Sequence, residues 1–516
     1  MSEKKELSQE SKLYALCEGL KFIQCERETY AKISVGNHVE IHNIQGESFQ
    51  NWVLERFQTE HGMACRQTSL ATLKLNLHAL ASREGAKEFV HKRIVRFGNR
   101  VYIDLCNPDW EVVEITPDGW SVIPAPVNFH RPSSCQPLPT PIRGGSIDDL
   151  RPLVNIGTPE NWTLLWAWVL GTFNTVGACP LLSVRGCQGS AKSTLTRLLK
   201  RLLDPSTMRE GGGMPATDEA FSLAAHNNYL LWFDNLSWLT DGMSDILCRV
   251  ATGGSFTKRL HYQNTDQFVV NIKNPVMLTS INDLIHKDDL VSRTVFLDID
   301  ILDSKKRVSE DYINNEFERI QPRLMGAIYE VIAACLKNYD SVVFKESPPR
   351  LADFAQWATA GESALGFPAG SIVGCLNSKI ARYTDDLYEN NLIVRTLAEM
   401  VKKSGGVWTG TKSEILEKVN EMASFTDHDT LPKNPIAMGN LLKRMTPCLT
   451  QKGFTLTDQP RKAGCRPVKV EYKAPPEISD LVNVPAVDSR DNQVPMTPDW
   501  KPWEIKESVD AKPKCA

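Results

Sequence analysis

The chain has 516 residues, of which 42% are apolar, so it is too long for one ordinary domain and has enough apolar side chains for several cores. Its net charge of −3 gives no global basic field, and any DNA contact must come from local patches. The thirteen cysteines form no CxxC pair or metal-type Cys/His spacing, which indicates neither a disulfide framework nor a zinc site. The charged start has no apolar stretch behind it and no run approaches 18 apolar residues, so we expect a cytoplasmic protein without a membrane partner.

Residues 1–145 are predicted to form an N-terminal α+β domain, although residues 1–48 carry no motif that can be named. Apolar residues at helical spacing, followed by apolar runs around turn signals, predict two helices and then two β-hairpins, over 49–57, 70–82, 93–104 and 110–123. The proline-rich stretch 124–141 is predicted to be a linker or an extended strap.

Residues 146–340 are predicted to form the next domain. Trp162, Trp166 and Trp168 predict a helix that packs on it, and we interpret these aromatics as core rather than as ligand contacts. An apolar run over 179–184 then predicts a buried strand, and leucines at helical spacing from Leu195 onward predict a helix.

The loop between that strand and that helix consists of Gly186, Cys187, Gln188, Gly189, Ser190, Ala191, Lys192, Ser193 and Thr194. Such an order presents backbone N–H groups, the positive end of a helix and a lysine to a phosphate group. We therefore predict an ATP-binding loop, with Lys192 on the β- and γ-phosphates and the Ser193 hydroxyl on Mg²⁺. The plain alternative is a glycine-containing turn of any α/β domain.

Ala191 departs from the pattern GxxxxGK[ST], which has glycine at this position. Alanine costs little there if the residue keeps a negative φ, and it adds one methyl group near the phosphates.

An apolar strand over 229–233 ends in Asp234 about forty residues beyond the loop. Because the carboxyl end of such a strand opens on the phosphate site, Asp234 is the predicted holder of the Mg²⁺ water shell. The alternative is a turn or helix N-cap aspartate.

A glycine pair, Gly253-Gly254, precedes a basic and aromatic stretch and predicts a hairpin that presents cations at its tip. The candidate DNA-binding residues, which would neutralise phosphates and stack on a base, are Lys258, Arg259, His261 and Tyr262. A solvated basic turn is the alternative.

A second apolar strand ends in Asn282, whose amide is suited to orienting an attacking water beside the γ-phosphate. Arg293 follows at a position suited to the γ-phosphate of a neighbouring subunit, where it would stabilise the charge that develops during hydrolysis. Taken singly, both are compatible with ordinary loop residues.

This succession of motifs over residues 150–340 resembles the superfamily-3 helicases, in particular the helicase half of phage and plasmid primase-helicases. The resemblance implies an AAA+-type P-loop ATPase core of α/β class that forms a ring, expected to be a hexamer. It implies Walker A at Lys192 and Ser193, Walker B at Asp234, a single-stranded-DNA hairpin at Lys258 and Arg259, a sensor at Asn282 and an arginine finger at Arg293.

The chain departs from that family at Asn235, where many members have a second acid that polarises the attacking water. Either hydrolysis is slow, or an acid such as Asp218 or Glu219 assists. No primase active site is recognisable, so a separate primase is a possible partner.

Beyond the core, residues 317–339 are predicted to be helical and to cover the nucleotide, and residues 341–400 to form a helical lid or connector. Residues 401–473 show helices closed by a β-hairpin, a winged-helix pattern for duplex DNA or for a protein contact. Its local cations are Lys443, Arg444, Lys452, Arg461, Lys462, Arg466 and Lys469. Residues 474–516 are polar and proline-rich and are predicted to be disordered.

Three functions are compatible with these features. The first is an ATP-dependent helicase or translocase for replication of a phage or other mobile element. The second is a nucleotide-gated origin-binding initiator or helicase loader that barely unwinds, which Asn235 favours. The third, a small-molecule phosphotransferase, explains neither Asn282 and Arg293 nor the C-terminal domain.

Overall fold

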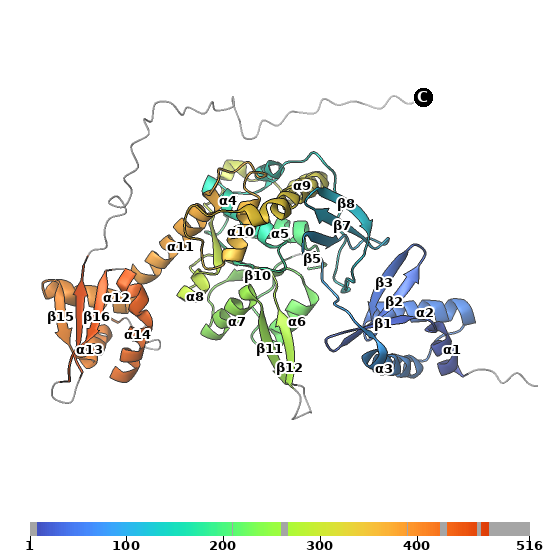
Figure 1. Ribbon diagram of the computed structural model, residues 1–516, viewed down its shortest axis with the longest axis horizontal. Helices are drawn as coiled ribbons and strands as arrows, with labels where there is room; N and C mark the ends of the chain where they lie inside the picture. The colour runs from blue at the N-terminus through green and yellow to red at the C-terminus, as the bar shows by residue number, and fades with distance from the viewer. Residues whose placement is uncertain are drawn as a thin grey trace, which may run out of the picture. The chain divides into compact units, whose positions relative to one another are not determined.

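The computed structural model describes residues 8–208, 210–259, 267–389, 391–423, 431–451, 453–461 and 466–473. The predicted tail, 474–516, lies outside the described residues. The chain divides into two units, Met1–Ala381 and Arg382–Ala516, and each is described by itself (Figure 1). None of the helices in the described ranges is long and apolar enough to cross a membrane.

The first part of unit 1 is a small sheet covered by helices. Its elements are α1 (Gln9–Leu16), β1 (Lys21–Cys25), β2 (Glu28–Val35), β3 (His38–Asn43), α2 (Glu47–His61), α3 (Gln67–Glu84) and β4 (Ala86–Lys87). The strand order is β3-β2-β1-β4, and only the short β4 runs parallel to its neighbour. The apolar face of α2, with Phe49, Val53 and Phe57 fully buried, confirms the helix predicted there.

The two predicted hairpins form one antiparallel meander, in the order β5-β6-β7-β8. Its strands are β5 (Ile94–Phe97), β6 (Arg100–Asp104), β7 (Glu111–Thr116) and β8 (Gly119–Pro124). The proline-rich stretch behind it is strapped down, since Phe129 is buried and the Leu138 amide donates to the Leu105 carbonyl over 2.9 Å.

The centre of unit 1 is a parallel four-stranded sheet in the order β10-β13-β9-β14. Its strands are β9 (Leu181–Arg185), β10 (Leu231–Leu236), β13 (Val276–Ser280) and β14 (Thr294–Asp298). Their continuous apolar runs are typical of strands that are buried on both faces. The strands predicted at 179–184, at 229–233 and before Asn282 are therefore confirmed.

Helices surround this sheet. They are α4 (Pro159–Gly171), α5 (Lys192–Leu203), α6 (Asp218–Asn227), α7 (Asp241–Thr252) and the short α8 (Asp288–Val291). Helix α4 holds Trp162, Trp166 and Trp168, all of which are buried, so their interpretation as core residues is confirmed. Between α7 and β13, the strands β11 (Gly254–Arg259) and β12 (Gln267–Ile272) pair as the predicted hairpin, which points away from the sheet in Figure 1.

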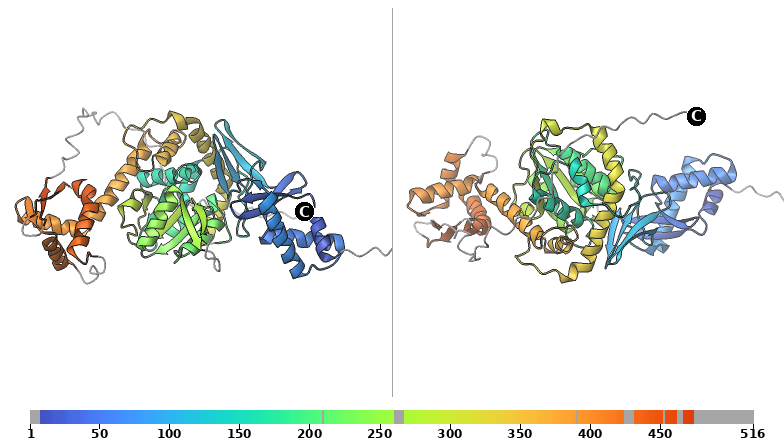
Figure 2. Two further views of the ribbon diagram at one scale, coloured as in Figure 1. Left: turned by 60° about the horizontal axis from the view of Figure 1, so that its bottom comes forward. Right: turned by 90° about the horizontal axis from the view of Figure 1, so that it is seen from above.

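The long helix α9 (Glu310–Asn338) includes the predicted helical segment and begins earlier. It contacts α5 on one side and strands β7 and β8 on the other, and Figure 2 shows it between the central sheet and the meander. The remaining elements of this part are η1 (Ile147–Leu153), η2 (Ser304–Lys306), η3 (Tyr339–Ser341), α10 (Ala352–Ala360) and α11 (Ser371–Glu389), whose last turns lie beyond the unit boundary.

The described residues of unit 2 form three further helices and a three-stranded antiparallel sheet in the order β15-β17-β16. Its elements are α12 (Leu392–Lys403), β15 (Val407–Gly410), α13 (Lys412–Met422), α14 (Pro435–Gln451), β16 (Phe454–Asp458) and β17 (Val468–Tyr472). Leu397, Ile415, Met438 and Val470 meet in one apolar core. The predicted order of helices closed by a β-hairpin is thus confirmed.

Candidate functional site

The predicted phosphate-binding loop leaves the carboxyl end of β9 and enters α5. A Cβ built on Gly186 would collide with the Ile299 carbonyl oxygen, so this position requires glycine. Gly189 has a φ of +80°. The loop therefore has the tight, left-handed course that brings successive backbone N–H groups to the start of a helix.

Ala191, which caps α5, has a φ of +66° and a ψ of +27°. The condition under which alanine would cost little, a negative φ, is therefore not met. A left-handed conformation crowds the Cβ against the following carbonyl and costs an L-residue about 1–2 kcal/mol, which is why glycine is the usual residue in such a loop.

Lys192 is the first residue of α5, and its ammonium group turns back over the loop. Nζ donates to the Gly186 carbonyl over 2.6 Å and to the Cys187 carbonyl over 2.9 Å. Burial lowers the pKa of Lys192, while the negative charge of Asp234 acts in the opposite direction. The side chain is therefore a cation held above the loop, with carbonyl partners that a phosphate can replace.

Ser193 and Asp234 meet at the predicted metal position. The Ser193 hydroxyl lies 3.2 Å and 3.1 Å from the two carboxylate oxygens of Asp234. Asp234 also accepts a hydrogen bond from the Thr279 hydroxyl on β13. Mg²⁺ prefers oxygen ligands, so a hydroxyl beside a carboxylate suits this ion. Ser193 is exposed and Asp234 is partly exposed, so solvent can reach both groups.

Thr279 is a site residue that sequence reasoning missed. It joins the ends of β10 and β13, because its hydroxyl also accepts the backbone N–H of Asn235 over 2.7 Å. The signal in the sequence is a pair of polar residues, Thr279 and Ser280, at the end of an apolar strand.

Asn235 itself lies at an irregularity in the pairing of β10 with β13 and has a φ of +52°. Asparagine tolerates this left-handed conformation better than most residues. Its side chain is exposed, beside Asp234 in the sequence.

A glycine run, Gly211 to Gly213, also packs against the site without having been predicted. A Cβ on Gly211 would lie 2.7 Å from the Cβ of Asp234, and the Asp234 amide donates to the Gly212 carbonyl over 3.0 Å. The two acids that were predicted as possible assistants of hydrolysis, Asp218 and Glu219, lie in the first turn of α6. The Asp218 carboxylate lies 4.0 Å from the guanidinium of Arg249.

Asn282 follows the carboxyl end of β13, whose neighbours in the sheet are β9 and β10. It therefore lies at the same edge of the sheet as the loop and Asp234. The residue is exposed.

Arg293 lies at the opposite edge of the sheet, where the parallel strands begin. It precedes β14, which runs parallel to β9, and its carbonyl accepts the amide of Leu181 at the start of β9. The structure thus does not bring Arg293 to Lys192 of its own chain. Its guanidinium donates to the Asp289 carbonyl over 2.6 Å and forms an ion pair with the carboxylate of the same residue.

Lys258 and Arg259 lie on β11, opposite Phe268 and Gln267 of β12. The other two candidate DNA-binding residues, His261 and Tyr262, lie outside the described residues. In unit 2, Lys443, Arg461 and Arg466 are exposed, and Lys469 pairs with Glu471.

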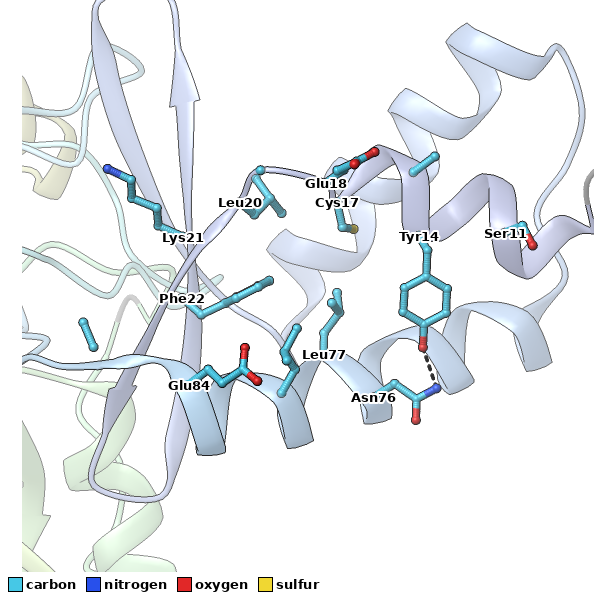
Figure 3. A pocket seen from close by; sticks show the side chains of 14 residues that line it. Ser11, Tyr14, Cys17, Glu18, Leu20, Lys21, Phe22, Asn76, Leu77 and Glu84 are labelled. Carbon is cyan, nitrogen blue, oxygen red and sulfur yellow. Dashed lines mark hydrogen bonds between the residues drawn. The ribbon is translucent and has the colours of Figure 1, made fainter.

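A groove with a volume of about 880 Å³ lies elsewhere, in the N-terminal part among α1, α3 and β1. Figure 3 shows Leu20, Phe22 and Leu77 along it, with Tyr14 and Asn76 hydrogen-bonded over 2.5 Å at one end. Its lining contains none of the predicted site residues.

The family comparisons agree with the order of the two units. A family described as the actinomycete integrative conjugative element replication protein matches residues 147–386. The family described as the AICE RepA C-terminal domain matches residues 393–479. Over these two segments, the chain is similar to the replication proteins of actinomycete integrative conjugative elements.

Other comparisons are weaker. No curated protein matches the chain. The apo structure of the NrS-1 C-terminal region is similar at 13% identity with a TM-score of 0.37, over 91% of this chain and 100% of that one. A JCV helicase crystallised with an aryl acetamide ligand matches at 14% identity and a TM-score of 0.22, over 48% of this chain and 66% of that one. TM-scores this low do not establish a shared fold.

Proposed function

We propose that the chain is an ATP-dependent DNA translocase of the AAA+ superfamily-3 type that serves the replication of an integrative conjugative element. The observation that carries this proposal is the convergence of Lys192, Ser193 and Asp234 at one edge of a parallel sheet. Lys192 would bind the β- and γ-phosphates of ATP, and the Ser193 hydroxyl with Asp234 would hold Mg²⁺.

The position of Arg293 supports an assembly with ATP between subunits. Because Arg293 and Lys192 lie at opposite edges of one sheet, a ring of copies would bring the Arg293 edge of one subunit to the loop of the next. We propose such a ring, with six subunits.

The β11–β12 hairpin would move along single-stranded DNA as the site cycles. Lys258 and Arg259, on β11, would supply charge for the phosphate groups of that DNA. Unit 2 would be a winged-helix domain that contacts duplex DNA through exposed cations such as Lys443 and Arg466.

The proposal is tested by ATP turnover of the full chain with and without single-stranded DNA. We expect DNA to stimulate the wild type severalfold and Lys192→Ala to abolish turnover, because the variant lacks the cation that binds the phosphates. Arg83→Ala, which changes an exposed arginine of α3, is the matched control and should behave as the wild type. Wild-type turnover that does not respond to DNA would contradict a translocase.

A second function, a nucleotide-gated origin-binding initiator or loader, is favoured by Asn235. The neutral amide stands directly after Asp234, where a second carboxylate would polarise the attacking water. Tight ATP binding with negligible turnover, together with a footprint on one specific duplex, is the result expected for that function.

A further inference from the structure

The segment between β14 and α9, residues 299–309, runs over the phosphate-binding loop of its own chain. The Ile299 carbonyl closes on Gly186. The Asn155 amide bridges the two parts, donating to the Ser190 carbonyl over 3.1 Å and to the Asp300 carbonyl over 2.8 Å. This segment is therefore fixed against the loop at two points.

Arg307 is the residue of this segment that approaches the middle of the loop. A Cβ built on Gly189 would lie 3.3 Å from Nη2 of Arg307. Because Gly189 has a positive φ and no side chain, nothing of this residue separates the guanidinium from the loop backbone. Arg307 thus lies against the loop that is predicted to bind the phosphates.

The guanidinium has no ion pair or side-chain hydrogen bond among the residues that the structure describes. Its two predecessors, Lys305 and Lys306, are also exposed, and the nearby Asp303 carboxylate accepts the Lys305 backbone N–H over 3.0 Å. Arg307 is thus an exposed cation beside a loop that also carries Lys192 and leads into the N-terminus of α5. Such a gathering of like charges is unfavourable in itself and is relieved by a bound anion.

We infer that Arg307 is a nucleotide-binding residue that acts within its own subunit, contacting the phosphates of the nucleotide that Lys192 holds. The inference rests on the proposed function and adds a second cation to the site. Arginine suits the role because its planar fork binds two phosphate oxygens at once, whereas lysine offers a point charge. A nucleotide with more phosphates therefore gains more from this contact.

The experiment compares equilibrium binding of ATP, ADP and AMP to the full chain without DNA. The variants are Arg307→Ala, Arg307→Lys and, as a matched control, Arg319→Ala, which removes an exposed arginine of α9. We expect Arg307→Ala to weaken ATP binding about tenfold and to leave AMP binding unchanged. Arg307→Lys should fall between this variant and the wild type, and Arg319→Ala should bind as the wild type does.

Lys192→Ala tests the ATP site independently of Arg307. If the wild type binds ATP, Lys192→Ala weakens it, and Arg307→Ala binds all three nucleotides like Arg319→Ala, the inference about Arg307 is overturned and the ATP site stands. If the wild type does not bind ATP at all, the proposed function fails and the role of Arg307 fails with it. Equal loss of ATP and AMP binding in Arg307→Ala also overturns the phosphate contact.

Discussion

The guanidinium of Arg293 lies 2.5 Å from the carboxylate of Asp289, one helical turn earlier, and only 11% of the Arg293 side chain is exposed. Asp289 is shared, since Arg350 approaches the same carboxylate to 2.6 Å with 51% of its side chain exposed. To reach a phosphate on a neighbouring copy, Arg293 would exchange its contact with Asp289 for one with that phosphate. Arg350 can then neutralise the Asp289 carboxylate that is left behind.

This arrangement predicts different effects for two arginines that share one partner. Arg293→Ala should lower ATP turnover at least a hundredfold, because an arginine finger stabilises charge in the transition state. Arg350→Ala, the matched control, should change turnover less than about threefold, since exposed ion pairs contribute little.

Mixing Arg293→Ala with Lys192→Ala subunits tests whether the ATP site is shared between neighbouring subunits. Subunits of Arg293→Ala retain an intact loop, and subunits of Lys192→Ala retain an intact Arg293. Mixing the two inactive variants should restore part of the turnover if the site lies between subunits. No recovery at any ratio would speak against a shared site.

The left-handed conformation of Ala191 leads to the second prediction. Ala191→Gly should raise the free energy of unfolding by up to about 1 kcal/mol, because glycine removes the Cβ crowding but loses more backbone entropy on folding. In urea denaturation, Ala224→Gly inside α6 serves as the control and should lower stability by about 1 kcal/mol. Equal destabilisation by both changes would contradict a strained loop.

The sequence allowed the central site to be predicted because its parts depend on local patterns. Apolar runs mark buried parallel strands, and the carboxyl ends of such strands meet at one edge, so Lys192, Ser193 and Asp234 could be expected together. The role of Arg293 toward a neighbouring subunit is predicted from its position after Asn282 and from the resemblance. Its place before β14, at the opposite edge, could not be inferred until the strand order was known.

Contacts between segments distant in sequence could not be predicted. Gly211 and Thr279 approach Asp234 only because of the order β10-β13-β9-β14. Arg307 reaches Gly189 because β14 and β9 are parallel neighbours, so the chain leaves β14 at the loop. Residues 1–48 contain two local hairpins, β1–β2 and β2–β3, which the sequence analysis missed although Gly36 marks the second turn.

Asn235 gives the third prediction. A φ of +52° is tolerated by asparagine and aspartate and disfavoured for β-branched residues. Asn235→Asp should therefore leave the urea midpoint nearly unchanged, while Asn235→Val should lower stability by about 1–2 kcal/mol.

Asn235→Asp also tests whether the residue next to Asp234 limits ATP hydrolysis. If the neutral amide limits hydrolysis, Asn235→Asp should raise ATP turnover severalfold, because it adds a carboxylate that can polarise water. Turnover should be measured at saturating ATP, so that any change in ATP affinity does not enter. Unchanged or lower turnover in Asn235→Asp would show that this position does not limit hydrolysis.

The fourth prediction concerns Asp204, a buried carboxylate that joins the meander to the central domain. It accepts hydrogen bonds from Lys200 Nζ over 2.7 Å and Arg93 Nε over 3.1 Å, and from the backbone amides of Tyr229 and Leu230. Burial alone would raise the pKa of Asp204, but Lys200, Arg93 and the Leu230 amide lower it to about 2.

Because the folded-state pKa lies below the unfolded value, the carboxylate stabilises the fold above about pH 4 and this contribution is lost as the pH falls toward 2. The shift corresponds to about 2 kcal/mol at neutral pH. Asp204→Asn should cost about 3–5 kcal/mol, because it leaves Lys200 and Arg93 buried without a counter-charge. The stability of Asp204→Asn should also fall less than that of the wild type between about pH 5 and pH 2, because the variant has no carboxylate to protonate at this position.

The measurement is the thermal melting temperature from pH 7 down to pH 3, compared with Asp148→Asn. Asp148 pairs with Arg151 on the surface, with 61% of its side chain exposed, so its loss should change stability by less than about 1 kcal/mol. A wild-type melting temperature that stays flat down to pH 3, or an Asp204→Asn variant with the same pH dependence as the wild type, would contradict the assignment. Either result would show that the negative charge of Asp204 does not help to hold the meander to the domain that carries the phosphate-binding loop.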